Sequence, residues 1–226
     1  MTSSAIARST RHIIWDWNGT LLDDNDAVVA AVNKVCAAFG CEHIDLERWR
    51  AVFGRPLHRS YEHVLGRALG EHDWTRIEKL YHDAYRELLP TCGLAHGVPE
   101  KLRAWIDSGR TQSLLSMWFH DELVPLVETF GLNALFTRID GLRAEIGGGS
   151  KADCLTEHVT VLGIDPAETV LIGDVADDAH AAERVGADCV LLTTGVMARP
   201  ALEATGFPVV DSITEALETV EAEAAA

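Results

Sequence analysis

The sequence has few basic residues and no long apolar run. Of its 226 residues, 19 are Lys or Arg and 35 are Asp or Glu, which gives a formal net charge of −16. Such an acidic surface repels DNA, RNA and anionic lipid, so we expect no nucleic-acid or membrane partner. No apolar run approaches the length that spans a bilayer. The hydrophobic content of 47% is ordinary for a globular protein, and the length suits one domain with a smaller insert.

Paired cysteines are also missing. The five cysteines are an odd number, are scattered and include no C-x-x-C spacing. This pattern indicates reduced thiols rather than a disulfide framework or a zinc site. The first twelve residues, MTSSAIARSTRH, lack the apolar core of a secretory signal. We therefore predict a cytoplasmic protein.

Short apolar runs rich in β-branched residues alternate with helical patterns. Near-continuous hydrophobicity is typical of strands that are buried on both faces of a parallel sheet. The predicted strands cover residues 12–17, 111–117, 169–175, 188–194 and 207–211. The predicted helices cover residues 99–109, 121–131, 151–163 and 177–187. This alternation predicts an α/β fold with a doubly wound, Rossmann-like parallel sheet.

The stretch from residue 22 to 92 interrupts this alternation. It has the periodicity of helices at 26–40, 45–54, 57–70 and 73–89, and it contains no convincing strand. We therefore predict two domains: an α/β core formed by residues 1–21 and 93–226, and an α-helical domain, residues 22–92, inserted after the first strand.

Asp16 ends the first apolar run, in the segment HIIWDWNGTLLDDND of residues 12–26. Asn-Gly between apolar runs is a strong hairpin signal, and in a hairpin Asp16 would be incidental. The residues that follow have helical spacing, with Asp and Asn at its start as N-cap candidates. We therefore favour a strand that leads into a helix. This places Asp16 at the carboxyl end of a strand, where open α/β sheets bind ligands.

Four more polar side chains stand at the ends of predicted strands or the starts of helices: Ser116, Lys151, Asp174 and Asp178. Each has an ordinary explanation, such as a strand-end hydroxyl, a solvated cation or a helix N-cap. Together with Asp16, these side chains give the order Asp, Ser, Lys, Asp at successive strand ends. Residues of these types can act together at one reaction centre.

The set resembles the haloacid dehalogenase (HAD) superfamily over most of the chain. Its Asp-x-Asp-x-Thr motif looks like DWNGT at 16–20, its Ser or Thr after a strand looks like Ser116, its lysine looks like Lys151, and its Gly-Asp-x-x-x-Asp motif looks like GDVADD with Asp174 and Asp178. The helical insert looks like the helical (C1-type) cap of the phosphoglycolate phosphatase and β-phosphoglucomutase branch. The resemblance implies a phosphomonoester hydrolase that acts on a small phosphorylated substrate.

The resemblance also implies a catalytic centre. Asp16 would attack phosphorus and form an aspartyl-phosphate, which divides one difficult hydrolysis into two steps. A carboxylate that attacks a phosphate needs its charge offset, and Mg²⁺ prefers oxygen ligands. Asp16, Asp174 and the backbone carbonyl of Asn18 would hold this ion.

The remaining motif residues are expected around that centre. Ser116 and Lys151 would grip the phosphoryl oxygens. Asp178 would hold Lys151 or a metal-bound water. Thr20 and Gly19 would shape the turn, with their backbone amides directed at the phosphate.

Asn18 departs from the family pattern. The phosphatases of the family have an aspartate there that protonates the leaving oxygen, and losing such a group costs roughly 10² to 10⁴ in rate. Either the leaving group departs unaided, or another residue supplies the proton, or the protein binds a phosphorylated ligand with little turnover. The candidates for a replacement proton donor are Asp23, Asp24, His58 and His120. Phosphonate or carbon–halogen cleavage ranks lower, because the insert offers only Lys34 and Lys79 for a Schiff base.

Three residues are candidates for substrate recognition. Arg55 and His58 lie where the inserted helices would approach the core, and Trp118 follows Ser116 in an apolar run. We expect a sugar phosphate or a phosphorylated sugar conjugate as substrate. The apolar run at Trp118 either packs under the inserted helices or favours a conjugate with an aromatic part. A monomer or a homodimer is expected.

Overall fold

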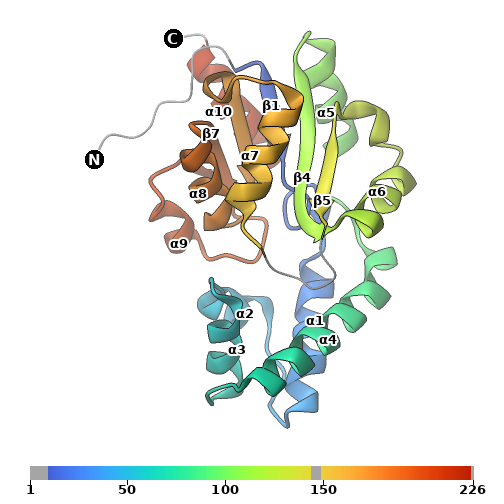
Figure 1. The fold of residues 1–226 in the computed structure, drawn as a ribbon, viewed down its shortest axis with the longest axis vertical. Helices are drawn as coiled ribbons and strands as arrows, with labels where there is room; N and C mark the ends of the chain where they lie inside the picture. The colour runs from blue at the N-terminus through green and yellow to red at the C-terminus, as the bar shows by residue number, and fades with distance from the viewer. Residues whose placement is uncertain (1–9, 144–148, 225–226) are drawn as a thin grey trace.

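A parallel sheet of six strands forms the centre of the protein (Figure 1). The computed structural model describes residues 10–143 and 149–224. The strand order is β5-β4-β1-β6-β7-β8, and each neighbouring pair is parallel. The strands are β1 (His12–Trp15), β4 (Thr111–Phe119), β5 (Ile139–Leu142), β6 (Thr169–Gly173), β7 (Asp188–Leu192) and β8 (Val209–Val210). The predicted doubly wound α/β fold is confirmed.

Helices cover both faces of the sheet, and the alternation of side chains in β1 shows how. Ile13 and Trp15 belong to one apolar cluster and Ile14 to the other, because successive strand residues point to opposite faces. The first cluster includes residues of α5 (Val98–Asp107), α6 (His120–Thr129) and α10 (Ile213–Ala224). The second includes residues of α7 (Lys151–Leu162), α8 (Ala176–Val185) and α9 (Arg199–Glu203).

Four helices lie together at one end of the molecule, below the sheet in Figure 1. They are α1 (Asn25–Ala38), α2 (Leu46–Val52), α3 (Leu57–Leu65) and α4 (Glu71–Leu88). We call them the four-helix region (residues 25–88). The chain passes between the sheet and this region through β2 (Leu22–Asp23) and β3 (Gly93–Leu94), which pair antiparallel. All four helices predicted for this stretch are present.

The turn after β1 leads into a helix and not into a hairpin. β1 pairs with β4 and β6, and the carbonyl of Trp17 accepts hydrogen bonds from the amides of Leu21 and Leu22, at 2.9 and 2.8 Å. α1 then begins at Asn25. The strand-to-helix interpretation of Asp16 is confirmed.

Some elements differ from the sequence prediction. β5 was not predicted, because its sequence IDGL contains a charged residue and a glycine. α9 and α10 were also not predicted. Three short 3₁₀ turns complete the described chain: Leu89–Thr91, Asn133–Leu135 and Pro166–Glu168. Within the described ranges, no helix combines the length and apolar character that crossing a membrane requires.

Candidate active site

Asp16 lies at the carboxyl end of the central strand. Its backbone amide donates to the carbonyl of Ile172 in β6, at 2.8 Å, so the pairing of β1 continues to this residue. The neighbours β4 and β6 lie on either side of β1. The crevice at such a point, where strand order reverses, is where open α/β sheets bind ligands. The side chain of Asp16 is nevertheless buried.

Lys151 is the first residue of α7. Ser150 caps this helix, since its hydroxyl accepts from the amide of Asp153 at 3.3 Å. The ammonium of Lys151 donates a hydrogen bond to Asp16 and lies 2.7 Å from an oxygen of Asp178. All three of these side chains are buried. The ammonium therefore bridges the nucleophile candidate and the carboxylate at the start of α8.

Three buried carboxylates converge at this point. Asp16, Asp174 and Asp178 each place an oxygen within 4.8 Å of the others. The backbone at Gly195 closes over them: a Cβ there would lie 1.7 Å from Oδ2 of Asp174. The amide of Val196 donates to the same oxygen at 3.2 Å. The loop after β7 thus holds Asp174 in place and needs a glycine to do so.

The electrostatics of the cluster leave an excess of negative charge. Burial raises the pKa of Asp16 to about 6, against the opposing charge of Lys151. Burial, together with the charges of Asp16 and Asp178, raises the pKa of Asp174 well above its ordinary value. Burial alone would lower the pKa of Lys151, but Asp16 and Asp178 raise it overall. One ammonium for three carboxylates, with oxygen as the available donor, suits a divalent cation such as Mg²⁺.

Ser116 was predicted at the end of its strand, but it lies within β4, because the strand continues to Phe119. The pairing with β1 stops at Leu114, and the register with β5 shifts between Leu115 and Phe119. The hydroxyl of Ser116 accepts from the amide of Trp118 at 3.0 Å and donates to the carboxamide oxygen of Asn18 at 3.3 Å. The irregularity in the strand thus places Ser116 beside the DWNGT turn.

The side-chain amide of Asn18 is fully engaged. Its nitrogen donates to Asp24 at 3.0 Å and to the hydroxyl of Tyr85 at 2.7 Å. Tyr85, from α4, also donates to Asp24 at 2.5 Å. Asn18 is therefore the centre of a network that links the turn after β1 to the four-helix region.

The backbone amides of Gly19 and Thr20 were expected to point at the phosphate, but both already donate to other groups. The amide of Gly19 donates to Asp24 at 2.8 Å, and the amide of Thr20 donates to the carbonyl of Trp17 at 3.3 Å. The turn closes on itself and on Asp24, so these donors are already used. The hydroxyl of Thr20 is fully buried.

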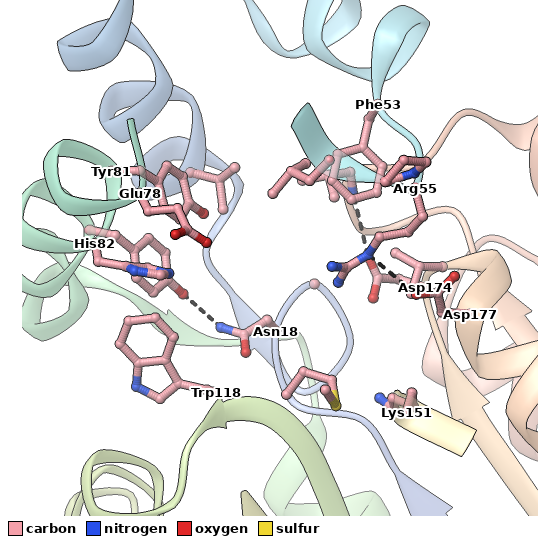
Figure 2. A pocket seen from close by; sticks show the side chains of 18 of the residues that line it. Asn18, Phe53, Arg55, Glu78, Tyr81, His82, Trp118, Lys151, Asp174 and Asp177 are labelled. Carbon is pink, nitrogen blue, oxygen red and sulfur yellow. Dashed lines mark hydrogen bonds and ion pairs between the residues drawn. The ribbon is translucent and has the colours of Figure 1, made fainter. Parts of the chain in front are cut away.

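A cavity of 760 Å³ opens above this cluster, between the sheet and the four-helix region (Figure 2). All three predicted recognition residues line it: Arg55, His58 and Trp118. Arg55 is ion-paired with Asp177 at 3.2 Å. Of the four candidate proton donors, Asp24 and His58 line the cavity, whereas Asp23 and His120 do not.

Three important residues were missed at the sequence level. Arg50, on α2, donates to the carbonyls of Thr193 and Gly195, at 3.1 and 2.6 Å, and ties α2 to the loop after β7. Tyr85 and Glu78 line the cavity from α4. Aromatic residues at helical spacing in 74–85 were the available signal, but the same spacing is typical of an ordinary buried helix face.

Similarity to known proteins identifies the family of this chain. A family model of haloacid dehalogenase-like hydrolases matches residues 13–192. The chain belongs to this family. The predicted HAD resemblance is thereby confirmed.

Relatives of this HAD chain include two curated proteins. Phosphoglycolate phosphatase 1 of Pseudomonas aeruginosa is 26% identical over 225 residues, which cover 93% of this chain and 79% of the relative. Phosphoglycolate phosphatase of Synechococcus elongatus is 29% identical, over 85% of this chain and 88% of the relative. The crystal structure of a predicted phosphatase from Clostridium acetobutylicum has a TM-score of 0.81 at 20% identity and covers 95% of this chain and 99% of its own, which supports the fold.

Proposed function

We propose that the protein is a Mg²⁺-dependent phosphomonoester hydrolase that forms an aspartyl-phosphate at Asp16. The enzyme class, a phosphoric monoester hydrolase, is the one that the family and its named relatives support. The observation that carries the mechanism is the meeting of Asp16, Lys151, Asp174 and Asp178 at the end of β1.

In the first step, an oxygen of Asp16 bonds to phosphorus while the bond between phosphorus and the leaving oxygen breaks. Water then bonds to phosphorus as the bond between phosphorus and Asp16 breaks, which releases inorganic phosphate and restores Asp16; the proton that water loses balances the one that the leaving oxygen takes up in the first step. Lys151 and Ser116 hold the phosphoryl oxygens as their charge redistributes. Asp178 keeps the ammonium of Lys151 in place.

Asp16, Asp174 and the backbone carbonyl of Asn18 would hold Mg²⁺. When bound there, the ion would offset the repulsion between a carboxylate and the phosphate dianion. The donor set supports this assignment, because the carboxylates are buried, close together and short of positive charge. Gly19 and Gly195 make room for the carboxylate of Asp174: a Cβ on Gly19 would lie 2.7 Å from its Oδ2.

Asn18 positions its neighbours but cannot transfer a proton. Tyr85 and Asp24, which Asn18 contacts directly, are two neighbouring groups that can carry one. Asn18 also motivates a second candidate function, a protein that binds a phosphorylated ligand and turns it over weakly. Cleavage of a phosphonate or a carbon–halogen bond has less support, because Lys34 and Lys79 are both exposed and neither lines the cavity.

The substrate is a small phosphorylated metabolite. The cavity of 760 Å³ is in the range that accommodates ligands of drug size, and its walls include Trp49, Tyr61 and Trp118. Aromatic walls favour a leaving group with an apolar or aromatic part, such as a sugar conjugate, over a bare sugar phosphate.

The four-helix region acts as a cap over this site, within an inserted domain of residues 22–92. The core domain is made of residues 1–21 and 93–226. We propose a cytoplasmic monomer or homodimer.

The test is phosphate release from a panel of phosphomonoesters, with Mg²⁺ and with EDTA. We expect release that requires Mg²⁺ and that falls at least about 10⁴-fold in Asp16→Asn, because covalent catalysis is then blocked. Circular dichroism and the melting temperature control for folding of the variant. A folded Asp16→Asn protein that keeps wild-type activity would refute the nucleophile assignment.

A further inference from the structure

One face of α4 forms a wall of the cavity. Positions 74, 77, 78, 81, 82 and 85 recur at the spacing of a single helix face, and all of them line the cavity. Their side chains are Trp74, Ile77, Glu78, Tyr81, His82 and Tyr85. Burial lowers the pKa of His82, which favours its neutral form. Glu78 is therefore the one side chain on this face that carries a full charge in its ordinary ionised form.

Aromatic rings stand on both sides of Glu78 along the helix. On one side, Trp74 contacts Tyr61, whose ring centroid is 6.0 Å away, and Tyr61 contacts Trp49 at 5.4 Å. On the other side, Tyr81 stacks on Tyr85 at 5.8 Å. Figure 2 shows Glu78 and Tyr81 directed into the cavity from α4. The carboxylate thus faces a space with π-surfaces around it, to which cations are attracted.

Glu78 has no hydrogen-bond or ion-pair partner among the described residues, and its side chain is partly buried. Burial alone raises its pKa. A carboxylate that loses water without gaining a partner is destabilised, so a cationic ligand group at this position would be favoured. This position is on the four-helix region, where the leaving group would lie, and away from the phosphoryl site.

The fixed cations of the cavity are already paired. Arg55 pairs with Asp177 at 3.2 Å, and Lys151 pairs with Asp16 and Asp178. Among the residues that the structure describes, no other lysine or arginine lines the cavity. A leaving group with a carboxylate, such as that of phosphoglycolate, would therefore meet the charge of Glu78, and the cavity cation outside the carboxylate cluster, Arg55, would be shared with Asp177.

We propose that the cavity selects phosphomonoesters whose leaving group carries a cationic nitrogen, bound between Glu78 and the adjacent aromatic rings. The inference rests on the proposed function, because the phosphate end of the same molecule must reach Asp16. It differs from the activity that the relatives' names state, since the leaving group of phosphoglycolate is an anion.

The experiment compares kcat/KM for three substrates: phosphocholine, its uncharged isostere 3,3-dimethylbutyl phosphate, and 2-phosphoglycolate. The wild type should prefer phosphocholine over the isostere at least 10-fold and should handle 2-phosphoglycolate worst. Glu78→Gln should reduce the preference for phosphocholine about 10-fold, mainly through a higher KM for phosphocholine, and should leave kcat/KM for the isostere unchanged. Glu87→Gln makes the same charge change on an exposed position of α4 and should behave as the wild type.

Calorimetric measurement of the binding of phosphocholine and of the isostere distinguishes failure of the proposed selection from failure of the proposed hydrolase activity. Binding that prefers phosphocholine and depends on Glu78, without phosphate release from any phosphomonoester of the panel, would refute the proposed function but support the selection. Hydrolysis of both compounds at equal kcat/KM would overturn the selection and leave the hydrolase intact. A preference for phosphocholine that Glu78→Gln does not reduce would also overturn the selection. No binding of either compound, together with no phosphate release from the panel, would overturn both proposals.

Discussion

The side-chain amide of Asn18 donates a hydrogen bond to the carboxylate of Asp24, with 3.0 Å between nitrogen and oxygen. Tyr85 donates to the same oxygen of Asp24, and the amide of Gly19 donates to the other. Asp24 therefore accepts from three donors at once. An amide at position 18 fits this arrangement because it is the donor that a second ionised carboxylate could not provide.

This arrangement predicts the effect of Asn18→Asp. Two carboxyl groups within hydrogen-bond distance cannot both ionise readily, so the pair retains one proton at neutral pH. A protonated carboxyl at position 18 can act as a general acid, and we expect phosphatase activity to be kept or raised, by about 10-fold or more for alkyl phosphates with poor leaving groups. Rates on p-nitrophenyl phosphate, whose leaving group needs no acid, should change little.

The measurement is a comparison of kcat for the two kinds of substrate in wild type, Asn18→Asp and Asn18→Ala. Asn18→Ala removes the donor to Asp24 without adding an acid, and it should be slower than the wild type on both. If Asn18→Asp proves as slow as Asn18→Ala on alkyl phosphates, position 18 has no role in proton transfer.

Gly195→Ala should weaken Mg²⁺ binding. The added Cβ would overlap Oδ2 of Asp174, and the conflict lies with a buried carboxylate in a packed loop. Displacing a ligand or its support typically costs 10- to 100-fold in metal affinity. We expect a loss of at least about 10-fold in Mg²⁺ affinity by calorimetry. Gly93→Ala, where nothing lies within 4 Å of the new Cβ, is the matched control.

Unchanged Mg²⁺ affinity in folded Gly195→Ala would contradict the placement of the ion at Asp174. The activity of the variant should recover in part as the Mg²⁺ concentration is raised, since the fault lies in binding. Failure of excess Mg²⁺ to restore any activity would indicate a wider distortion of the site.

The lowered pKa of His12 predicts that the folded protein loses stability in acid. Burial, and then the charge of His158, lower the pKa of His12 from 6.5 to about 4. The folded state therefore favours the neutral imidazole, which is bonded to the hydroxyls of Thr111 and Ser113. The unfolded chain takes up a proton as the pH falls below 6.5, so the stability is present at pH 7 and is lost toward pH 4.

For His12 alone, the expected loss between pH 7 and pH 4.5 is about 2 kcal/mol of unfolding free energy. Urea denaturation at the two pH values measures it. Other groups titrate in this range as well, so the comparison is with His12→Gln, which should lose about 2 kcal/mol less than the wild type. Equal losses in both proteins would show that His12 is not held neutral.

Sequence patterns predict the site residues that stand at the ends of clearly marked strands and helices. Asp16, Lys151 and Asp174 follow strong strand patterns or start a clear helix, and the rules for parallel sheets bring such residues to one edge. The four helices between residues 25 and 88 were predicted because their apolar spacing is regular. β5 was not predicted, since Asp140 is stabilised there by its ion pair with Arg138 and its hydrogen bond with His158, which only the tertiary structure supplies.

The contacts between distant segments were beyond sequence reasoning. Tyr85 is 61 residues from Asp24, and Arg50 is 145 residues from the carbonyl that it binds at Gly195. The amide of Gly19 was expected to face a phosphate, but a carboxylate five residues later takes it. Pattern and spacing predict which face of an element is buried, but not which partner lies opposite.

The most direct test of the central claim is a crystal structure of the protein with Mg²⁺ and beryllium fluoride, which mimics a phosphoryl group on a carboxylate. We expect beryllium bonded to an oxygen of Asp16, fluorine atoms in contact with Lys151 and Ser116, and one Mg²⁺ between Asp16 and Asp174. A beryllium fluoride adduct on another carboxylate, or Mg²⁺ bound away from Asp174, would contradict it.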